Sequence, residues 1–335
     1  MSFYGKGVTS INRLCKLFKT GLIRPCRFLS TTVSSKGKLD LSGVFPPMPT
    51  PFDQDESIAY DKLEKNIALW DKVPFRGLVV QGSNGEYVYL STEERVELVK
   101  RVREFLPSAS DKLLLAGSGC ESTKATIQMS ERMAAVGADA VMVVTPSYYK
   151  PGMKDKALHS HFTAVADRSP VPVILYSVPA FTVIDLSLDV IVDLAHHPNI
   201  VGIKESGGDI TKIGNIVHQT QGLDFQVIAG SASFLLATLQ IGGVGGVAAL
   251  ANVLGKEVCE LHKLFSEGKL SAAVDLQKRL IAPNSAVTKD FGITGLKQVM
   301  DWKGFYGGPT RSPLQPLPET EIAKLRKVFV ESGYL

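Results

Sequence analysis

Residues 171–204 read VPVILYSVPAFTVIDLSLDVIVDLAHHPNIVGIK and contain two apolar runs on either side of a helical pattern. The runs Val171–Tyr176 and Ile200–Lys204 do not alternate between apolar and polar residues, which is typical of strands buried on both faces of a parallel sheet. Between them, Leu188–Leu194 has the spacing of a helix. The stretch therefore predicts a strand, a helix and a second strand parallel to the first.

The same unit recurs along most of the chain. Eight apolar runs alternate with helical patterns, at residues 43–47, 77–81, 113–117, 140–145, 171–176, 200–204, 226–230 and 245–249. Ser91-Thr92-Glu93-Glu94 is a capping box that begins one of the helices, and residues 209–220 form another. Eight strand–helix units predict a (β/α)8 barrel. A doubly wound sheet is the alternative, but no Gly-x-Gly-x-x-Gly pattern follows the first strand.

The strand pattern stops after residue 255. Helical patterns follow at residues 257–264, 272–281, 295–302 and 319–330, and four prolines between 309 and 318 indicate an extended connector. We therefore assign residues 40–255 to the barrel and residues 256–335 to a C-terminal helical extension.

The first 38 residues differ from the rest in charge. They contain eight of the 37 basic residues and no acidic one, so the remaining 29 bases face 33 acids and the rest of the chain is net negative. A sequence pI near 8.7 is therefore no evidence for nucleic-acid binding, and we expect no nucleic-acid partner.

This basic segment has the composition of a mitochondrial targeting sequence. Apolar residues lie on one side of a helical projection, at Ile11, Leu14, Cys15, Phe18 and Leu22, and Arg27-Phe28-Leu29-Ser30 resembles a matrix-protease site. We predict that residues 1–35 are a presequence and that the protein works in the mitochondrial matrix. The alternatives are a basic tail without fixed structure and a helix on a membrane surface.

The sequence gives little support for metal or membrane chemistry. The longest apolar run, Val141–Val144, is far shorter than the roughly 20 residues of a membrane span. Cys120 and Cys259, the cysteines outside the presequence, form no Cys-x-x-Cys pair, which indicates a reducing compartment and no zinc site. None of the six histidines closes a predicted strand. We expect no metal and no membrane partner.

In a barrel, catalytic residues lie where the strands end. Lys204 closes an apolar strand, where lost hydration disfavours the ammonium form. A neutral amine at this place could attack a ketone and form an iminium, an electron sink for carbon–carbon cleavage. The alternative is a lysine paired with a carboxylate inside the barrel. We expect Glu205 to be a structural partner of a base.

Two other strand ends offer further chemistry. Tyr176 could move protons beside Lys204, with Tyr148 as a relay, or could be a core aromatic with a bonded hydroxyl. Gly82-Ser83-Asn84-Gly85 offers amide donors and a hydroxyl suited to a carboxylate, or forms an ordinary turn. The glycines at 242–246 favour close packing over a phosphate site.

Four motifs occur in order at predicted strand ends: Gly82-Ser83-Asn84-Gly85-Glu86, Thr145-Pro146-Ser147-Tyr148-Tyr149, Tyr176-Ser177-Val178-Pro179 and Gly202-Ile203-Lys204-Glu205-Ser206. Over residues 40–330 the chain resembles the pyruvate-lyase family of N-acetylneuraminate lyase and dihydrodipicolinate synthase. The resemblance implies a barrel enzyme that acts on a small 2-oxo acid and has no cofactor beyond a covalent Schiff base. It also implies a homotetramer built as a dimer of dimers.

The resemblance also implies a role for each matching residue. Lys204 matches the Schiff-base lysine, Tyr176 the general acid and base, and Tyr148 a tyrosine that crosses a dimer interface into the neighbouring site. Four positions match residues at the substrate, with the first two at its pyruvoyl carboxylate: Ser83, Asn84, Ser206 and Gly230.

Two positions depart from the family pattern. Dihydrodipicolinate synthases carry an arginine where this chain has Phe181, and an apolar ring cannot hold a second carboxylate in a bidentate contact. Ser147 replaces a tyrosine common in synthases, whereas Tyr148 is kept. A pyruvate-forming aldolase is therefore favoured over a synthase. The alternatives that remain are a dihydrodipicolinate synthase-like enzyme, a 2-keto-3-deoxy sugar acid aldolase, a metal- or phosphate-dependent barrel enzyme and a catalytically silent barrel.

Overall fold

The computed structural model describes residues 39–335, so the predicted presequence lies outside the described residues. Its strands form one eight-stranded parallel sheet, in which each strand from β2 to β7 pairs with the next along the chain and β1 pairs with β8. The bounds are β1 Gly43–Phe45, β2 Gly77–Val80, β3 Leu113–Gly117, β4 Ala140–Val144, β5 Val173–Ser177, β6 Ile200–Glu205, β7 Gln226–Ala229 and β8 Gly245–Val247. All eight predicted strands are present.

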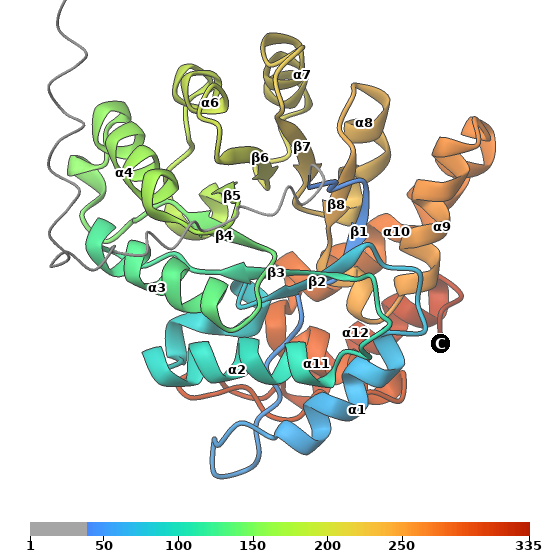
Figure 1. Cartoon of the computed structure of the whole chain (residues 1–335). Helices are drawn as coiled ribbons and strands as arrows, with labels where there is room; N and C mark the ends of the chain where they lie inside the picture. Colours follow the sequence, from blue (N-terminus) through green and yellow to red (C-terminus); the bar gives the residue numbers. More distant parts are fainter. Residues whose placement is uncertain (1–38) are drawn as a thin grey trace, which may run out of the picture. The chain divides into compact units, whose positions relative to one another are not determined.

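The sheet closes between β1 and β2. Just beyond β1, the backbone N–H of Met48 donates to the carbonyl of Val79 at 2.9 Å, and the Val79 N–H donates to the carbonyl of Pro46 at 3.0 Å. These bonds join the two edges that the strand ladder leaves open, so the architecture is a (β/α)8 barrel, as predicted (Figure 1). A doubly wound sheet would have two open edges and a reversal in strand order.

Helices follow the strands and surround them (Figure 1). Their bounds are α1 Tyr60–Trp70, α2 Thr92–Phe105, α3 Thr123–Ala135, α4 Asp155–Arg168, α5 Pro179–Thr182, α6 Leu188–Ala195, α7 Ile210–Gln219 and α8 Leu235–Gln240. The predicted capping box begins α2: the Glu94 N–H donates to Ser91 Oγ at 3.2 Å, and the Ser91 N–H donates to Glu94 Oε2 at 2.8 Å. Two N–H groups at the start of the helix, which have no partner within the helix, are thereby hydrogen-bonded.

Side chains of successive strand residues point alternately into the barrel and toward the helices. Phe45, Val79, Met142 and Ile174 fill the barrel interior and are buried, whereas their strand neighbours pack against the surrounding helices. The strands are therefore buried on both faces, which is the physical reason for their continuous apolar runs.

The helical extension contains α9 Gly255–Ser266, α10 Leu270–Ser285, α11 Gly292–Trp302 and α12 Glu319–Glu331. All four predicted helices are present. Helix α10 packs against α8 and α9, and residues 39–335 form one compact unit. No helix among these residues is long and apolar enough to cross a membrane.

Candidate active site

The pairing of β5 with β6 brings Tyr176 and Lys204 together. The two residues are register partners, and Lys204 Nζ lies 3.9 Å from the centre of the Tyr176 ring. Both are almost completely buried, with 4% and 5% of Lys204 and Tyr176 exposed. Because Ile174, two residues before Tyr176, faces the barrel interior, Tyr176 and Lys204 also face it, at the C-terminal ends of their strands.

Lys204 has no polar partner in the described part of the chain. Its side chain makes no ion pair or hydrogen bond there, and its Nζ lies over the face of the Tyr176 ring. The alternative of a lysine paired with a carboxylate is therefore wrong for these residues.

Glu205 points away from Lys204, on the opposite side of β6. Its carboxylate accepts the backbone N–H groups of Gly207 at 3.0 Å and Gly208 at 3.1 Å. Burial raises the pKa of Glu205, while these two hydrogen bonds oppose the rise. The charge of one base, Lys212, acts on the Glu205 carboxylate without an ion pair between them, and Glu205 also fixes the turn that follows Lys204.

The Gly82–Gly85 turn reaches Tyr176 from β2. Ser83 Oγ lies 3.3 Å from the Tyr176 hydroxyl, within hydrogen-bond distance, and Asn84 follows on the same short 3-10 helix. Gln81 and Glu86, on either side of the turn, both have left-handed backbone, with φ of 66° and 52°. Each non-glycine residue in that region costs about 1–2 kcal/mol, so the rest of the structure must hold the turn in place.

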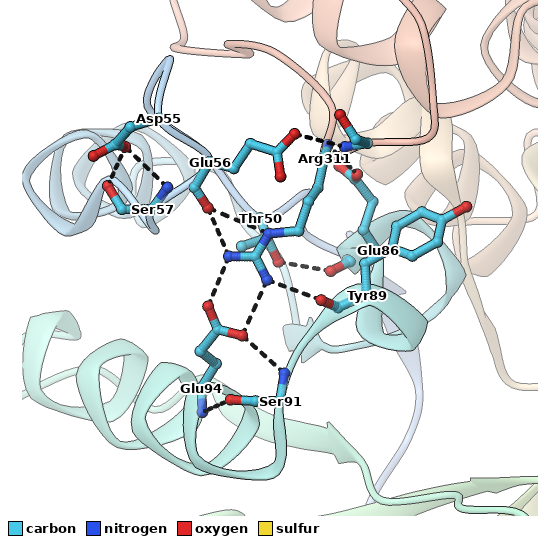
Figure 2. A network of polar contacts seen from close by, with 11 residues as sticks. Thr50, Asp55, Glu56, Ser57, Glu86, Tyr89, Ser91, Glu94 and Arg311 are labelled. Atoms are coloured by element: carbon cyan, nitrogen blue, oxygen red, sulfur yellow. Dashed lines mark hydrogen bonds and ion pairs between the residues drawn. The ribbon is translucent and has the colours of Figure 1, made fainter.

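Contacts from the helical extension hold Glu86. Its carboxylate forms an ion pair with Lys297 Nζ of α11 at 2.6 Å, and each side chain is 1% exposed. The backbone N–H of Arg311 donates to Glu86 Oε2 at 2.9 Å. Figure 2 shows the Arg311 guanidinium between the Glu94 carboxylate and the backbone carbonyls of Glu56 and Tyr89. The extension therefore supports the turn that carries Ser83 and Asn84.

Ser206 and Gly230 lie beside Lys204, at the ends of β6 and β7. Ser206 Oγ is buried and has no hydrogen-bond partner among residues 39–335. A Cβ on Gly230 would lie 1.8 Å from that oxygen, so only glycine leaves room for the Ser206 side chain. A buried hydroxyl without a partner can bind a polar ligand atom.

Tyr148 does not join this group within one chain. Its side chain is 77% exposed, and it makes no hydrogen bond or ring contact with Tyr176 or Lys204 among the described residues. Glu121 Oε2 accepts the backbone N–H groups of Ser147 at 3.0 Å and Tyr148 at 2.9 Å and so fixes the loop. The role of Tyr148 in a neighbouring site stays a prediction.

The sequence matches the model of the dihydrodipicolinate synthetase family over residues 40–331. The chain belongs to this family. A probable mitochondrial 4-hydroxy-2-oxoglutarate aldolase of Emericella nidulans is 36% identical over 293 residues, which cover 87% of this chain and 94% of the relative. A 4-hydroxy-tetrahydrodipicolinate synthase of Methanothrix thermoacetophila is 34% identical over 293 residues, covering 88% and 97%.

Solved structures agree with this assignment. A crystal structure of dihydrodipicolinate synthase from Bacillus anthracis superposes with a TM-score of 0.83 at 32% identity, covering 87% of this chain and 98% of that one. The chain is thus a dihydrodipicolinate synthetase family member with the barrel of its solved relatives, and an enzyme of the lyase and synthase type.

In this family member, sequence reasoning missed Arg95. It lies on the buried side of α2 with Leu98, Val99 and Val102, and it lines one small cavity together with Tyr176. The available signal was a charged residue at a position where the helical pattern requires an apolar one. Lys297 gave a comparable signal, because it shares the buried side of α11 with Leu296 and Met300, but nothing in the sequence identified Glu86 as its partner.

Between residues 39 and 335, no three His, Cys, Asp or Glu side chains lie together as metal ligands would.

Proposed function

We propose that this protein is a Schiff-base aldolase that cleaves 4-hydroxy-2-oxoglutarate to pyruvate and glyoxylate. The observation that carries the proposal is Lys204, a buried amine without a polar partner, packed on the ring of Tyr176. The family assignment supports pyruvate chemistry at this lysine. The similarity to the probable aldolase of Emericella nidulans supports the choice of substrate.

The first half of the reaction joins the substrate to Lys204. The neutral amine attacks the C2 carbonyl, and Tyr176 donates a proton to the oxygen that becomes the carbinolamine hydroxyl. Loss of water leaves a protonated imine. Ser83, in contact with the Tyr176 hydroxyl, and its neighbour Asn84 hold the adjacent carboxylate, and Ser206 and Gly230 border the substrate.

The second half breaks the C3–C4 bond. Tyr176, now deprotonated, accepts the proton of the C4 hydroxyl while the electron pair of the bond moves into the imine. Glyoxylate leaves, and the resulting enamine is protonated at C3. Water then releases pyruvate and returns the Lys204 amine. No metal or other cofactor takes part, so a chelator leaves the rate unchanged.

Phe181 separates the aldolase from a dihydrodipicolinate synthase. It lies in α5, directly after β5, and 69% of it is exposed at the position where synthases carry the arginine named above. An apolar ring offers no bidentate contact for the carboxylate of an aldehyde partner. A synthase and a 2-keto-3-deoxy sugar acid aldolase are the alternatives that product analysis distinguishes.

Borohydride reduction tests the proposal directly. With pyruvate present, reduction should add a three-carbon group to the peptide that contains Lys204 and should abolish activity. Lys297 is the matched internal control, because it is also a buried lysine but is paired with Glu86. An adduct on another lysine, or none, contradicts the mechanism. An adduct without cleavage of 4-hydroxy-2-oxoglutarate contradicts the substrate alone.

We also propose that the enzyme is a homotetramer in the mitochondrial matrix and that Tyr148 completes the neighbouring subunit's site. The exposure of Tyr148 supports this role. A chain that starts at Lys36 should be soluble and fully active, since the proposed presequence serves targeting only. If that chain folds but loses activity, residues 1–35 have another role.

A further inference from the structure

Arg95 carries a buried positive charge. The residue is 6% exposed, and every acceptor of its guanidinium is uncharged while Cys120 is a thiol. Nε donates to Gln81 Oε1 at 2.9 Å, one terminal nitrogen donates to the carbonyls of Gly117 and Gly119 at 2.9 and 3.2 Å, and the other donates to Cys120 Sγ at 3.4 Å. Within residues 39–335, no carboxylate lies at ion-pair distance from it.

A guanidinium remains protonated in proteins, so this charge is neither lost nor neutralised by a neighbour. A buried charge without a counter-ion is costly, even when its donors are satisfied.

The backbone around Arg95 leaves no room for other side chains. A Cβ on Gly117 would lie 2.1 Å from the Gln81 carbonyl oxygen, and a Cβ on Gly119 would lie 2.7 Å from a methyl carbon of Val144. The two carbonyls that accept from Arg95 therefore belong to residues that must be glycine. The ends of β2 and β3 are brought close together around the guanidinium.

The charge borders the proposed catalytic tyrosine. Arg95, Tyr87 and Tyr176 line the same small cavity, and the guanidinium carbon lies 5.2 Å from the centre of the Tyr87 ring. Burial raises the pKa of Tyr87, and the Arg95 charge opposes that rise. Lys204 Nζ in turn lies 3.9 Å from the centre of the Tyr176 ring. In such a dry environment a fixed charge acts more strongly than it would in water.

The other titratable groups around the cavity do not cancel this charge. Glu121 is the acid that acts on Tyr87, and its carboxylate is bonded to the backbone N–H groups of the Tyr148 loop. The titratable groups that face the cavity or adjoin it are Tyr87, Cys120, Glu121, Tyr176 and Lys204.

We propose that Arg95 is a positioning residue whose unpaired charge favours the deprotonated hydroxyl of Tyr176 and the neutral amine of Lys204. Both forms carry one positive charge less than their protonated partners, so a fixed cation favours both. The inference rests on the proposed function, in which Tyr176 gives its proton to the carbinolamine oxygen and later accepts the proton of the C4 hydroxyl. Arg95 itself does not touch the substrate.

Cys120→Asp tests this by placing a carboxylate beside the guanidinium, and Cys120→Asn is the uncharged control of the same size. Cancelling the charge should move the rising limb of kcat/KM against pH upward by about one unit, which is about a tenfold loss of kcat/KM below the limb. Cys120→Asn should keep the wild-type limb. Arg95→Met removes the charge in a second way and should move the limb in the same direction.

A role in stability alone would lower the unfolding midpoint, or lower kcat equally at all pH values, without moving the limb. The inference is overturned if folded Cys120→Asp or folded Arg95→Met keeps the wild-type limb. Borohydride trapping on the wild-type enzyme separates the two hypotheses. No adduct at Lys204 refutes the proposed function, whereas an adduct with an unmoved limb refutes only the role of Arg95.

Discussion

Replacing Lys297 by methionine should strongly destabilise the enzyme. Its ammonium and the Glu86 carboxylate are each 1% exposed, so the change leaves a buried carboxylate with the Arg311 N–H as its remaining donor. Removing one member of such a pair typically costs about 3–5 kcal/mol. Because Glu86 ends the turn that carries Ser83 and Asn84, KM for the 2-oxo acid should rise more than kcat falls.

A double-mutant cycle measures how strongly the Glu86 and Lys297 charges stabilise each other. Glu86→Gln combined with Lys297→Met removes both charges, so the double variant should lose less free energy of unfolding than the two single changes added together, by about 1–3 kcal/mol. Urea unfolding at a fixed protein concentration measures all four proteins. Lys324→Met, on the exposed side of α12, is the control and should change stability by less than about 0.5 kcal/mol. Additive losses would refute the view that the two groups form one buried pair.

Three further predictions concern other parts of the molecule. Gly230→Ala should abolish activity, because its Cβ would lie 1.8 Å from Ser206 Oγ, 2.6 Å from Ser206 Cβ and 2.8 Å from the Glu205 carbonyl oxygen, and Ser206→Ala in the same chain should not restore it; full activity of a folded Gly230→Ala variant would contradict this. Tyr148→Phe should lower kcat by about 10²–10⁴-fold, and mixing it with Lys204→Ala subunits should return activity in verified mixed dimers, unless Tyr148 acts within its own chain. Burial lowers the pKa of His161 to about 4, from an ordinary value of 6.5. The unfolded chain therefore binds the extra proton between these pH values, and the free energy of unfolding should fall by up to about 3 kcal/mol as the pH drops through that window. His161→Asn should lack this slope in urea titrations.

The strands could be predicted because each is buried on both faces. Runs such as Val171–Tyr176 and Ile200–Lys204 have no polar alternation, and a parallel barrel is a fold in which that pattern is required. The proximity of Tyr176 and Lys204 could be predicted by the same reasoning, since consecutive strands of a barrel are neighbours and their C-terminal ends lie together.

Contacts outside that strand order could not be predicted. Arg95 reaches the cavity from a helix, and Glu86 meets Lys297 from the C-terminal extension. Neither contact leaves a local pattern, because sequence periodicity describes which face is buried and not what it touches. The backbone donors of Glu205 were missed for a related reason: backbone N–H groups are present at every residue and leave no trace in the sequence.

The dependence of Glu86 on Lys297 and Arg311 has a consequence for biosynthesis. Ribosomes complete the eight strands well before the residues that hold the Ser83 turn have been translated. A nascent or prematurely terminated chain that ends near residue 290 would contain both Tyr176 and Lys204 but would leave the Glu86 carboxylate without its buried cation. Because domains generally fold as units during synthesis, such a product would be a substrate for chaperones and proteases rather than a weakly active enzyme.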